Sequence, residues 1–344
     1  MSGESSSAAA WSGLLEPARL PADWPRRADD PRLGEVIEFW KGDAAALKPG
    51  RAVIVGFPQD EGVRRNGGRA GAAEAPRDIR SHLWRLVPCD GSTGTDLSAR
   101  PPLDIGDVLA KGTLEDSQDA LATVIAELLT RKAVPVILGG GHETAYGHYL
   151  GYVGAKKPVG IINLDAHLDV RPLIDGKGHS GSPFRQALEH PQQPLPGNMY
   201  VCIGVQPQSI SQAHLQYVSQ RGGRVAWCAS VQSAFATERL LARHIARMQK
   251  ARRQVYVSID ADVVRQADMP GVSAPNPSGL PGHDLMAAAR HAGGQPAVSS
   301  FDVVEINPRL DHDGQSTRWA ALVVWHFLMG LAERKAGKPT GKRS

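Results

Sequence analysis

Residues 159–169 read VGIINLDAHLD. The first six residues, 159–164, are apolar almost throughout, a pattern typical of a strand that is buried on both faces of a sheet. In the five that follow, every second side chain is charged or is a histidine, so in an extended chain Asp165, His167 and Asp169 point to the same side. This stretch therefore predicts a buried strand whose end carries three side chains of kinds that bind metal ions.

The same kind of short apolar run recurs along the chain. It is found at residues 52–56, 134–138, 199–204, 224–227, 255–259 and 298–304. Helix-like stretches, such as 117–131 and 234–252, separate several of these runs. The alternation of buried strands with helices predicts an α/β fold, in which a mostly parallel sheet is covered by helices on both sides.

The two ends of the chain differ from this regular body. Residues 1–45 are rich in Ser, Ala, Pro and charged residues. Three tryptophans are spread through them: Trp11, Trp24 and Trp40. Such a segment is either loosely ordered or lies on the body with its tryptophans as anchors. We expect an amino-terminal arm at 1–45, a single domain at 46–335 and a tail at 336–344.

The composition argues against several classes of protein. Of the 344 residues, 42% are hydrophobic and 22% charged, as in ordinary globular proteins. No apolar run reaches 18 residues, and the start of the chain lacks the basic and apolar regions of a secretory signal, so we expect a cytoplasmic protein that does not enter membranes. The net charge of +4 comes from scattered bases, with clusters at 250–253 and 335–343 typical of solvated helix ends, and no nucleic-acid partner is expected. The three cysteines are too widely spaced to indicate a disulfide framework or a zinc finger.

Two other predicted strands end in residues of the same kinds. The run 255–259 is followed by Asp260 and, two residues later, Asp262, which alternation again places on one side. The run 134–138 is followed by GGGHE, in which the glycines permit a tight turn that presents His142. Because sites in such sheets lie beyond the carboxyl ends of the strands, we expect all these side chains to gather at one edge.

Four carboxylates gathered in a cleft of low dielectric are unstable together unless a cation lies among them. A single Asp at a strand end is more often a helix N-cap. Three such motifs that each close a strand instead indicate a metal centre, and carboxylates can bridge two ions about 3.5–4 Å apart. An oxygen-rich set with one imidazole per ion suits manganese better than zinc, while nickel and iron stay open.

These motifs resemble those of the ureohydrolase superfamily of arginases, agmatinases and formimidoylglutamases, from about Ala52 to the end of the domain. The resemblance implies an arginase-like, three-layer α/β/α fold with a mostly parallel sheet of about eight strands, an active catalytic domain at 46–335 and two Mn2+ per subunit. It also implies a role for each ligand. His142 and Asp169 bind the first ion, His167 and Asp262 bind the second, and Asp165 and Asp260 bridge the two.

The segment FDVVEINP, residues 301–308, matches the same family. Its Glu305 is the natural partner of a planar cation, because a carboxylate can accept two parallel N–H bonds from an amidinium or guanidinium. We expect water activated by the metals to attack the carbon of that group. Asp169 is then the expected proton shuttle to the departing nitrogen. Asp169 and Glu305 are thus the predicted catalytic residues.

Within the superfamily, the chain most closely resembles the formimidoylglutamase branch. That resemblance implies hydrolysis of N-formimidoyl-L-glutamate to L-glutamate and formamide, a step in histidine degradation. Arg171 and Arg185 are forked donors suited to the two carboxylates of this substrate, and Asn66 and Ser180 are further expected substrate contacts. Phe184 stands where arginases carry a histidine, which argues against an arginase. Two arginines argue against a cationic substrate tail such as that of agmatine.

Three alternatives stay open on sequence alone. The first is a hydrolase of a guanidino acid that releases urea, as a guanidinobutyrase or agmatinase-like enzyme does. The second is a one-zinc deacetylase-like enzyme, against which the second acidic pair argues. The third is a metal-loaded but inactive partner subunit of an active homologue. The family habit also suggests a homo-oligomer, either a trimer or a hexamer.

Overall fold

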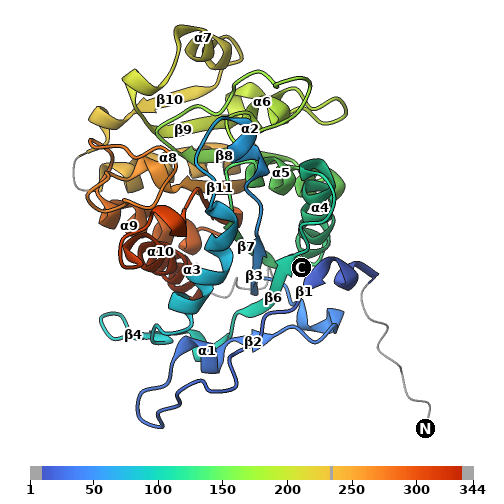
Figure 1. Ribbon diagram of the computed structural model, residues 1–344, viewed down its shortest axis with the longest axis vertical. Coiled ribbons are helices and arrows are strands. Elements are labelled where there is room, and N and C mark those ends of the chain that lie inside the picture. The colour runs from blue at the N-terminus through green and yellow to red at the C-terminus, as the bar shows by residue number, and fades with distance from the viewer. Residues whose placement is uncertain (1–9, 233–234, 335–344) are drawn as a thin grey trace, which may run out of the picture.

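A ten-stranded sheet forms the centre of the protein (Figure 1), for which a computed structural model describes residues 10–232 and 235–334. In spatial order its strands are β1 (Leu15–Glu16), β6 (Leu103–Val108), β3 (Ala52–Phe57), β7 (Val134–Gly139), β12 (Val298–Val304), β11 (Gln254–Asp260), β8 (Val159–Leu164), β9 (Tyr200–Val205) and β10 (Arg224–Trp227), with β2 (Glu38–Phe39) also paired to β6. All neighbouring strands run parallel except β1, which is antiparallel to β6. The predicted mostly parallel sheet is confirmed.

Helices cover both faces of this sheet, so the predicted three layers are also confirmed. Figure 1 shows α4 (Leu114–Thr130) and α5 (Thr144–Gly154) on one side, and α3 (Ala75–Leu83), α9 (Gly282–Gly294) and α10 (Gln315–Ala332) on the other. The remaining helices are α1 (Leu33–Val36), α2 (Glu61–Arg65), α6 (Pro183–Leu188), α7 (Gln212–Gln220) and α8 (Ala236–Lys250), and a small hairpin joins β4 (Cys89–Asp90) to β5 (Thr95–Asp96). Among the described residues, none of the helices combines the length and apolar character needed to cross a membrane.

Helix α4 begins three residues before the predicted start at 117 because Thr113 caps it. The Thr113 hydroxyl accepts from the backbone N–H of Asp116, whose carboxylate accepts from the backbone N–H of Thr113 in return. This reciprocal pair satisfies two amides that would otherwise lack partners at the helix start. Ala234, at the predicted start of the second helix, lies outside the described residues, as do the predicted tail and the basic cluster at 335–343.

Strand β6 is not among the predicted strands, because its sequence LDIGDV is not an apolar run. Asp104 is nevertheless fully buried, and Arg80 on α3 donates to Asp104 Oδ2 at 2.8 Å and to Asp107 Oδ1 at 2.7 Å. A carboxylate is tolerated in such a place only when it is paired and hydrogen-bonded. The strand therefore depends on a partner from α3, which periodicity along β6 does not reveal.

The described part of the arm lies on the body. Strands β1 and β2 extend the sheet beside β6, and the Trp11 and Trp40 rings stack with their centroids 5.3 Å apart. Trp24 packs edge-on against Trp84 at 6.4 Å. Of the two interpretations of this segment, the structure favours the one in which the tryptophans anchor it.

Candidate metal centre and active site

The predicted metal ligands meet at the carboxyl edge of the sheet, where four neighbouring central strands end. In spatial order these strands are β7, β12, β11 and β8. His142 follows β7, Glu305 follows β12, Asp260 ends β11, and Asp165 follows β8. Because each strand is buried and ends at the same edge, side chains separated by more than a hundred residues come within a few ångströms of one another.

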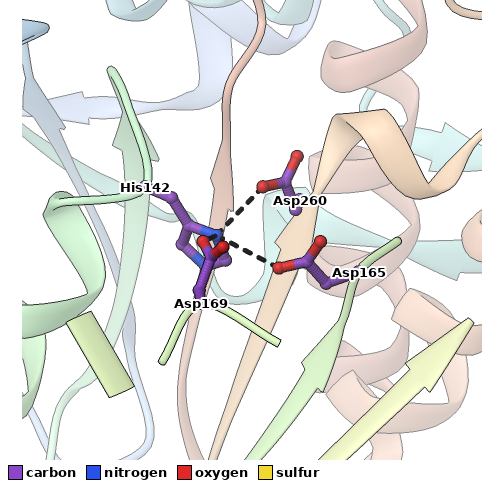
Figure 2. A group of neighbouring side chains, drawn as sticks. All are labelled: His142, Asp165, Asp169 and Asp260. Atoms are coloured by element: carbon purple, nitrogen blue, oxygen red, sulfur yellow. Dashed lines mark ion pairs between the residues drawn. The ribbon is translucent and has the colours of Figure 1, made fainter. Parts of the chain in front are cut away.

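The first group of ligands surrounds the His142 ring (Figure 2). His142 Nδ1 lies 2.8 Å from Asp169 Oδ2, 2.9 Å from Asp260 Oδ2 and 3.4 Å from Asp165 Oδ2. One atom from each of these four residues lies within 4.8 Å of every other, an arrangement that could hold a metal ion. His142, Asp165 and Asp260 are buried, and Asp169 is 11% exposed.

The second group shares Asp165 with the first. His167 Nδ1 lies 3.1 Å from Asp262 Oδ2 and 3.4 Å from Asp165 Oδ1, so the two Asp165 oxygens face different groups. This is the geometry of a bridging carboxylate. Among the described residues, Asp260 belongs to the first group alone. Its bridging role therefore stays a prediction.

The electrostatics of the cluster call for a cation. Burial and the charges of Asp262 and Asp165 raise the pKa of Asp260 well above its usual range. Burial also raises the pKa of Asp262, against the opposing charge of His167. Burial alone would lower the pKa of His142, but the carboxylates of Asp165, Asp169 and Asp260 outweigh it and hold the pKa well above its usual range. These shifts show that the cluster favours added positive charge, which a divalent ion would provide.

The His142 ring is oriented to offer a bare nitrogen to an ion. The Ser258 hydroxyl donates to Asp302 Oδ1 at 2.5 Å, so its oxygen accepts from His142 Nε2, which lies 3.2 Å away. The proton on Nε2 leaves Nδ1 as the coordinating atom. His142 Nδ1 is buried and makes no hydrogen bond of acceptable geometry to any described residue, although three carboxylate oxygens surround it. The residues present therefore fit a metal ion.

Glu305 lies beside this cluster in an unusual backbone conformation. Its φ is 65° and that of Asp169 is 46°, both in the left-handed region, which side-chain-bearing residues seldom adopt. Such conformations concentrate at functional sites, where the surrounding structure enforces them. Glu305 Oε1 accepts from the backbone N–H of His142 at 2.7 Å. Burial and the nearby carboxyls of Glu143 and Asp262 raise the pKa of Glu305 to about 8.

Residues from both ligand groups and Glu305 line one cavity together with three predicted substrate contacts: Asn66, Arg171 and Ser180. These three are joined to one another. Asn66 Nδ2 donates to Ser180 Oγ at 3.0 Å, and Arg171 Nη1 donates to Asn66 Oδ1 at 3.1 Å. The lining thus combines acidic side chains, from the ligands and Glu305, with a guanidinium and two neutral polar side chains.

Arg185 is not among the described residues that line this cavity. Its Nε donates to the carbonyl of Val170 at 2.9 Å, its Nη1 donates to Glu189 at 3.2 Å, and its guanidinium lies 4.1 Å from the centre of the Tyr217 ring. These contacts favour a structural role for Arg185 over the predicted substrate contact. Arg171 is the one predicted arginine that the structure brings to the cavity.

Family comparison agrees with the fold and the site. Residues 50–330 match the Arginase family. The chain belongs to the arginase family. The ureohydrolase membership predicted from the motifs is confirmed, and relatives from the predicted branch are prominent among its matches.

Two of these arginase-family relatives illustrate the similarity. A formimidoylglutamase of Geobacillus thermodenitrificans is 40% identical over 282 residues, which cover 81% of this chain and 84% of that protein. One of Clostridium tetani is 33% identical over 287 residues, which cover 81% and 82%.

Among solved structures, Trypanosoma cruzi formiminoglutamase with Mn2+ superposes with a TM-score of 0.79 at 33% identity, over 89% of this chain and all of that one. Formimidoylglutamase of Bacillus subtilis superposes with a TM-score of 0.83 at 25% identity, over 92% and 97%.

Phe184 distinguishes this arginase-family site at the position where the sequence comparison expects the histidine of arginases. Its ring packs edge-on against the His142 ring at 5.2 Å and is fully buried. A phenyl ring cannot carry a proton, so Phe184 cannot take the part of that histidine.

Two polar residues of the site were not predicted, although a signal for them exists. Ser258 lies two positions before Asp260, and Asn163, whose Nδ2 donates to Asp165 Oδ2 at 2.9 Å, lies two positions before Asp165. The alternation that groups the ligands therefore also places these residues on the same side of their strands. Ser273 and Ala274, which also line the cavity, carry no comparable signal.

Proposed function

We propose that this arginase-family enzyme is a formimidoylglutamase, which hydrolyses the formimino group of N-formimidoyl-L-glutamate to give L-glutamate and formamide. The observation that carries the proposal is the polarity of the cavity. Its acidic side chains suit the planar formimino cation, and Arg171 suits a carboxylate of the glutamate tail. The formimidoylglutamases that match over four fifths of this chain support the assignment.

The cofactor we propose is a pair of Mn2+ ions, held by the six ligands of the two groups. The ligands are oxygen-rich, with one imidazole in each group, as manganese prefers, and a similar structure was solved with Mn2+. When bound, two such ions lower the pKa of water toward neutrality and stabilise negative charge that develops on the substrate. We assign Asp165 and Asp260 as the bridging ligands.

The side chains of this chain then position the substrate and move protons. Glu305 accepts N–H bonds from the amidinium, while its contact with the His142 backbone fixes its own orientation. Arg171 binds a tail carboxylate and is held by Asn66, which Ser180 fixes in turn. Asp169, the most exposed carboxylate of the first group, receives a proton from the attacking water and passes it to the departing amino nitrogen.

A hydrolase of a guanidino acid that releases urea is the second candidate. One observation favours it: of the described residues that line the cavity, Arg171 is the one arginine. A substrate with one carboxylate, such as guanidinobutyrate, would need no more. The same metal ligands and Glu305 would serve both reactions, so the tail separates the two candidates.

We further propose the setting of the enzyme. Residues 46–335 form one catalytic domain preceded by the arm at 1–45 and followed by the tail at 336–344. The protein acts in the cytoplasm, as a homo-oligomer of three or six subunits, in the breakdown of histidine. Analytical ultracentrifugation of the full chain tests this oligomeric state. A monomer at all concentrations would contradict it.

Parallel assays of the manganese-loaded protein test the substrate. N-formimidoyl-L-glutamate is scored for formamide, while guanidinobutyrate, agmatine and arginine are scored for urea. Formamide from the first substrate alone is the expected result. Urea from guanidinobutyrate without formamide would replace the proposal by the second candidate.

A further inference from the structure

Glu143, the residue after His142, reaches away from the ligands toward the start of α2. Its side chain is 1% exposed, and Oε1 accepts from the backbone N–H of Gly62 at 2.7 Å. Its Oε2 is buried without a hydrogen-bond partner among the described residues. The contact therefore links the loop that carries a metal ligand to a helix 81 positions away in sequence.

The fit around this carboxyl group is tight on both sides. A Cβ added at Gly62 would lie 2.5 Å from Glu143 Cδ, and one added at Gly141 would lie 2.1 Å from Glu143 Oε2. Real Cβ atoms do not approach other atoms so closely. Glycine at these two positions thus leaves the slot that the carboxyl group fills.

Helix α2 receives this contact because its own N-cap residue is engaged elsewhere. Asp60 makes no side-chain cap, and its Oδ2 instead accepts from the backbone N–H of Gly71 at 2.7 Å. Gln59 Oε1 accepts from the backbone N–H of Glu61 at 3.0 Å, and Glu143 accepts from the next one. A side chain from another strand end therefore completes the cap of α2.

The peptide of Gly62 connects Glu143 to the side chains that are proposed to bind the substrate tail. Its carbonyl accepts from the backbone N–H of Asn66 at 3.0 Å and from that of Ser180 at 3.1 Å. The Asn66 side chain in turn accepts from Arg171. All three tail contacts are thus tied, directly or through Asn66, to the residue that Glu143 holds.

The other end of the substrate is tied to the same loop. The backbone N–H of His142 donates to Glu305, which is proposed to bind the amidinium, and the next side chain along the chain holds Gly62. Two neighbouring residues therefore set the separation between the amidine-binding carboxylate and the tail-binding group. A separation fixed in this way selects substrates by the distance between their charged ends.

We propose that Glu143 is a positioning residue, which holds Asn66, Ser180 and Arg171 at the distance from the metal centre that an acidic substrate tail requires. The inference rests on the proposed function, because it takes the substrate to have such a tail. Glu143 is not among the described residues that line the cavity or form the two ligand groups.

Three variants at this position and one control test the proposal. Glu143→Ala removes the acceptor, Glu143→Asp keeps a carboxyl group but withdraws it from Gly62, and Glu143→Gln keeps an acceptor of the same reach. In Gln118→Ala the control loses a buried hydrogen bond to the backbone carbonyl of Glu143, which measures 2.8 Å, and leaves the carboxyl group in place. The readouts are KM and kcat for N-formimidoyl-L-glutamate, the inhibition constant of glutamate and the bound manganese per chain.

We expect Glu143→Ala and Glu143→Asp to raise both KM and the glutamate inhibition constant about tenfold, as leaving the backbone N–H of Gly62 without its buried acceptor implies. Their kcat and manganese content should stay within about twofold of wild type. Glu143→Gln and Gln118→Ala should resemble wild type. Unchanged KM in Glu143→Asp, or a rise in KM in Gln118→Ala equal to that in Glu143→Asp, would overturn the proposal.

The two proposals fail in different ways. If wild type releases urea from guanidinobutyrate and no formamide, the proposed function fails. The same variants are then compared on guanidinobutyrate, with butyrate as the competing tail. A rise of KM confined to Glu143→Ala and Glu143→Asp would still support the positioning role, and a KM equal to that of wild type would refute it.

Discussion

Ser258→Ala removes the one hydroxyl between the His142 ring and a buried carboxylate. Ser258 Oγ lies 3.2 Å from His142 Nε2 and 2.5 Å from Asp302 Oδ1. Alanine leaves the His142 N–H without an acceptor, while Asp302 keeps two other donors, Tyr256 and His148. The ring then loses the contact that fixes its tautomer and its direction toward the first ion.

The magnitude follows from these contacts. A buried polar group left without a partner costs about 1–3 kcal/mol, which sets the expected loss in the free energy of unfolding. Removal of a hydrogen-bond partner behind a metal-binding histidine typically weakens metal binding about 10- to 100-fold. We expect that loss for the first ion alone, because no contact of Ser258 reaches His167 or Asp262 among the described residues.

Titration of the metal-free protein with Mn2+, followed by electron paramagnetic resonance, measures the two binding steps. Ser300→Ala is the matched control: Ser300 is equally buried and lies 2.7 Å from Nε2 of His148, whose Nδ1 contacts Asp302. It should lower stability by a similar amount without weakening either binding step. Unchanged manganese affinity in Ser258→Ala, or equal weakening in Ser300→Ala, would refute the reasoning.

Three other predictions follow from the site. Asp165→Asn should abolish binding of both ions and all activity, whereas Asp262→Asn should lose only the second ion; metal analysis after dialysis checks both. Arg171→Ala should raise KM about tenfold or more with little change in kcat, and Arg185→Ala should lower only the melting temperature; equal effects on KM would favour the prediction from sequence that both arginines bind the substrate. Burial raises the pKa of the Glu143 carboxyl group from its usual 4.5 to about 7 in the folded protein. The folded state therefore holds this proton more tightly than the unfolded chain does. The stability that the proton contributes is present below pH 4.5 and is lost as the pH rises through 7. Denaturant unfolding of metal-free protein should therefore show wild type losing up to about 3 kcal/mol relative to Glu143→Gln between pH 5 and 8, and a constant difference would contradict this.

The parts of the site that the sequence predicts are those governed by local geometry. Alternation along an extended chain is enough to group Asp165 with His167 and Asp260 with Asp262. The shared edge of a parallel sheet places these groups and His142 on the same side of the sheet. That they also lie within reach of one another depends on β7, β12, β11 and β8 being neighbours, an order that the sequence does not give.

The parts that the sequence does not predict depend on partners from distant segments. The two aspartates of strand β6 are paired with Arg80 on α3, so the strand lacks the apolar run by which the other strands are predicted. Arg171 and Arg185 look alike in sequence, but α7 brings Tyr217 onto Arg185, while Asn66 holds Arg171 beside the cavity. Such differences are set by tertiary packing, which residue type and spacing do not encode.

Identification of the products of N-formimidoyl-L-glutamate hydrolysis tests the central claim most directly. The purified chain is assayed with and without manganese, and formamide, glutamate, ammonia and N-formylglutamate are quantified together. Water attack at the amidine carbon with departure of the amino nitrogen predicts formamide and glutamate in equal amounts, and only in the presence of the metal. Ammonia and N-formylglutamate, or equal turnover after complete removal of the metal, would contradict it.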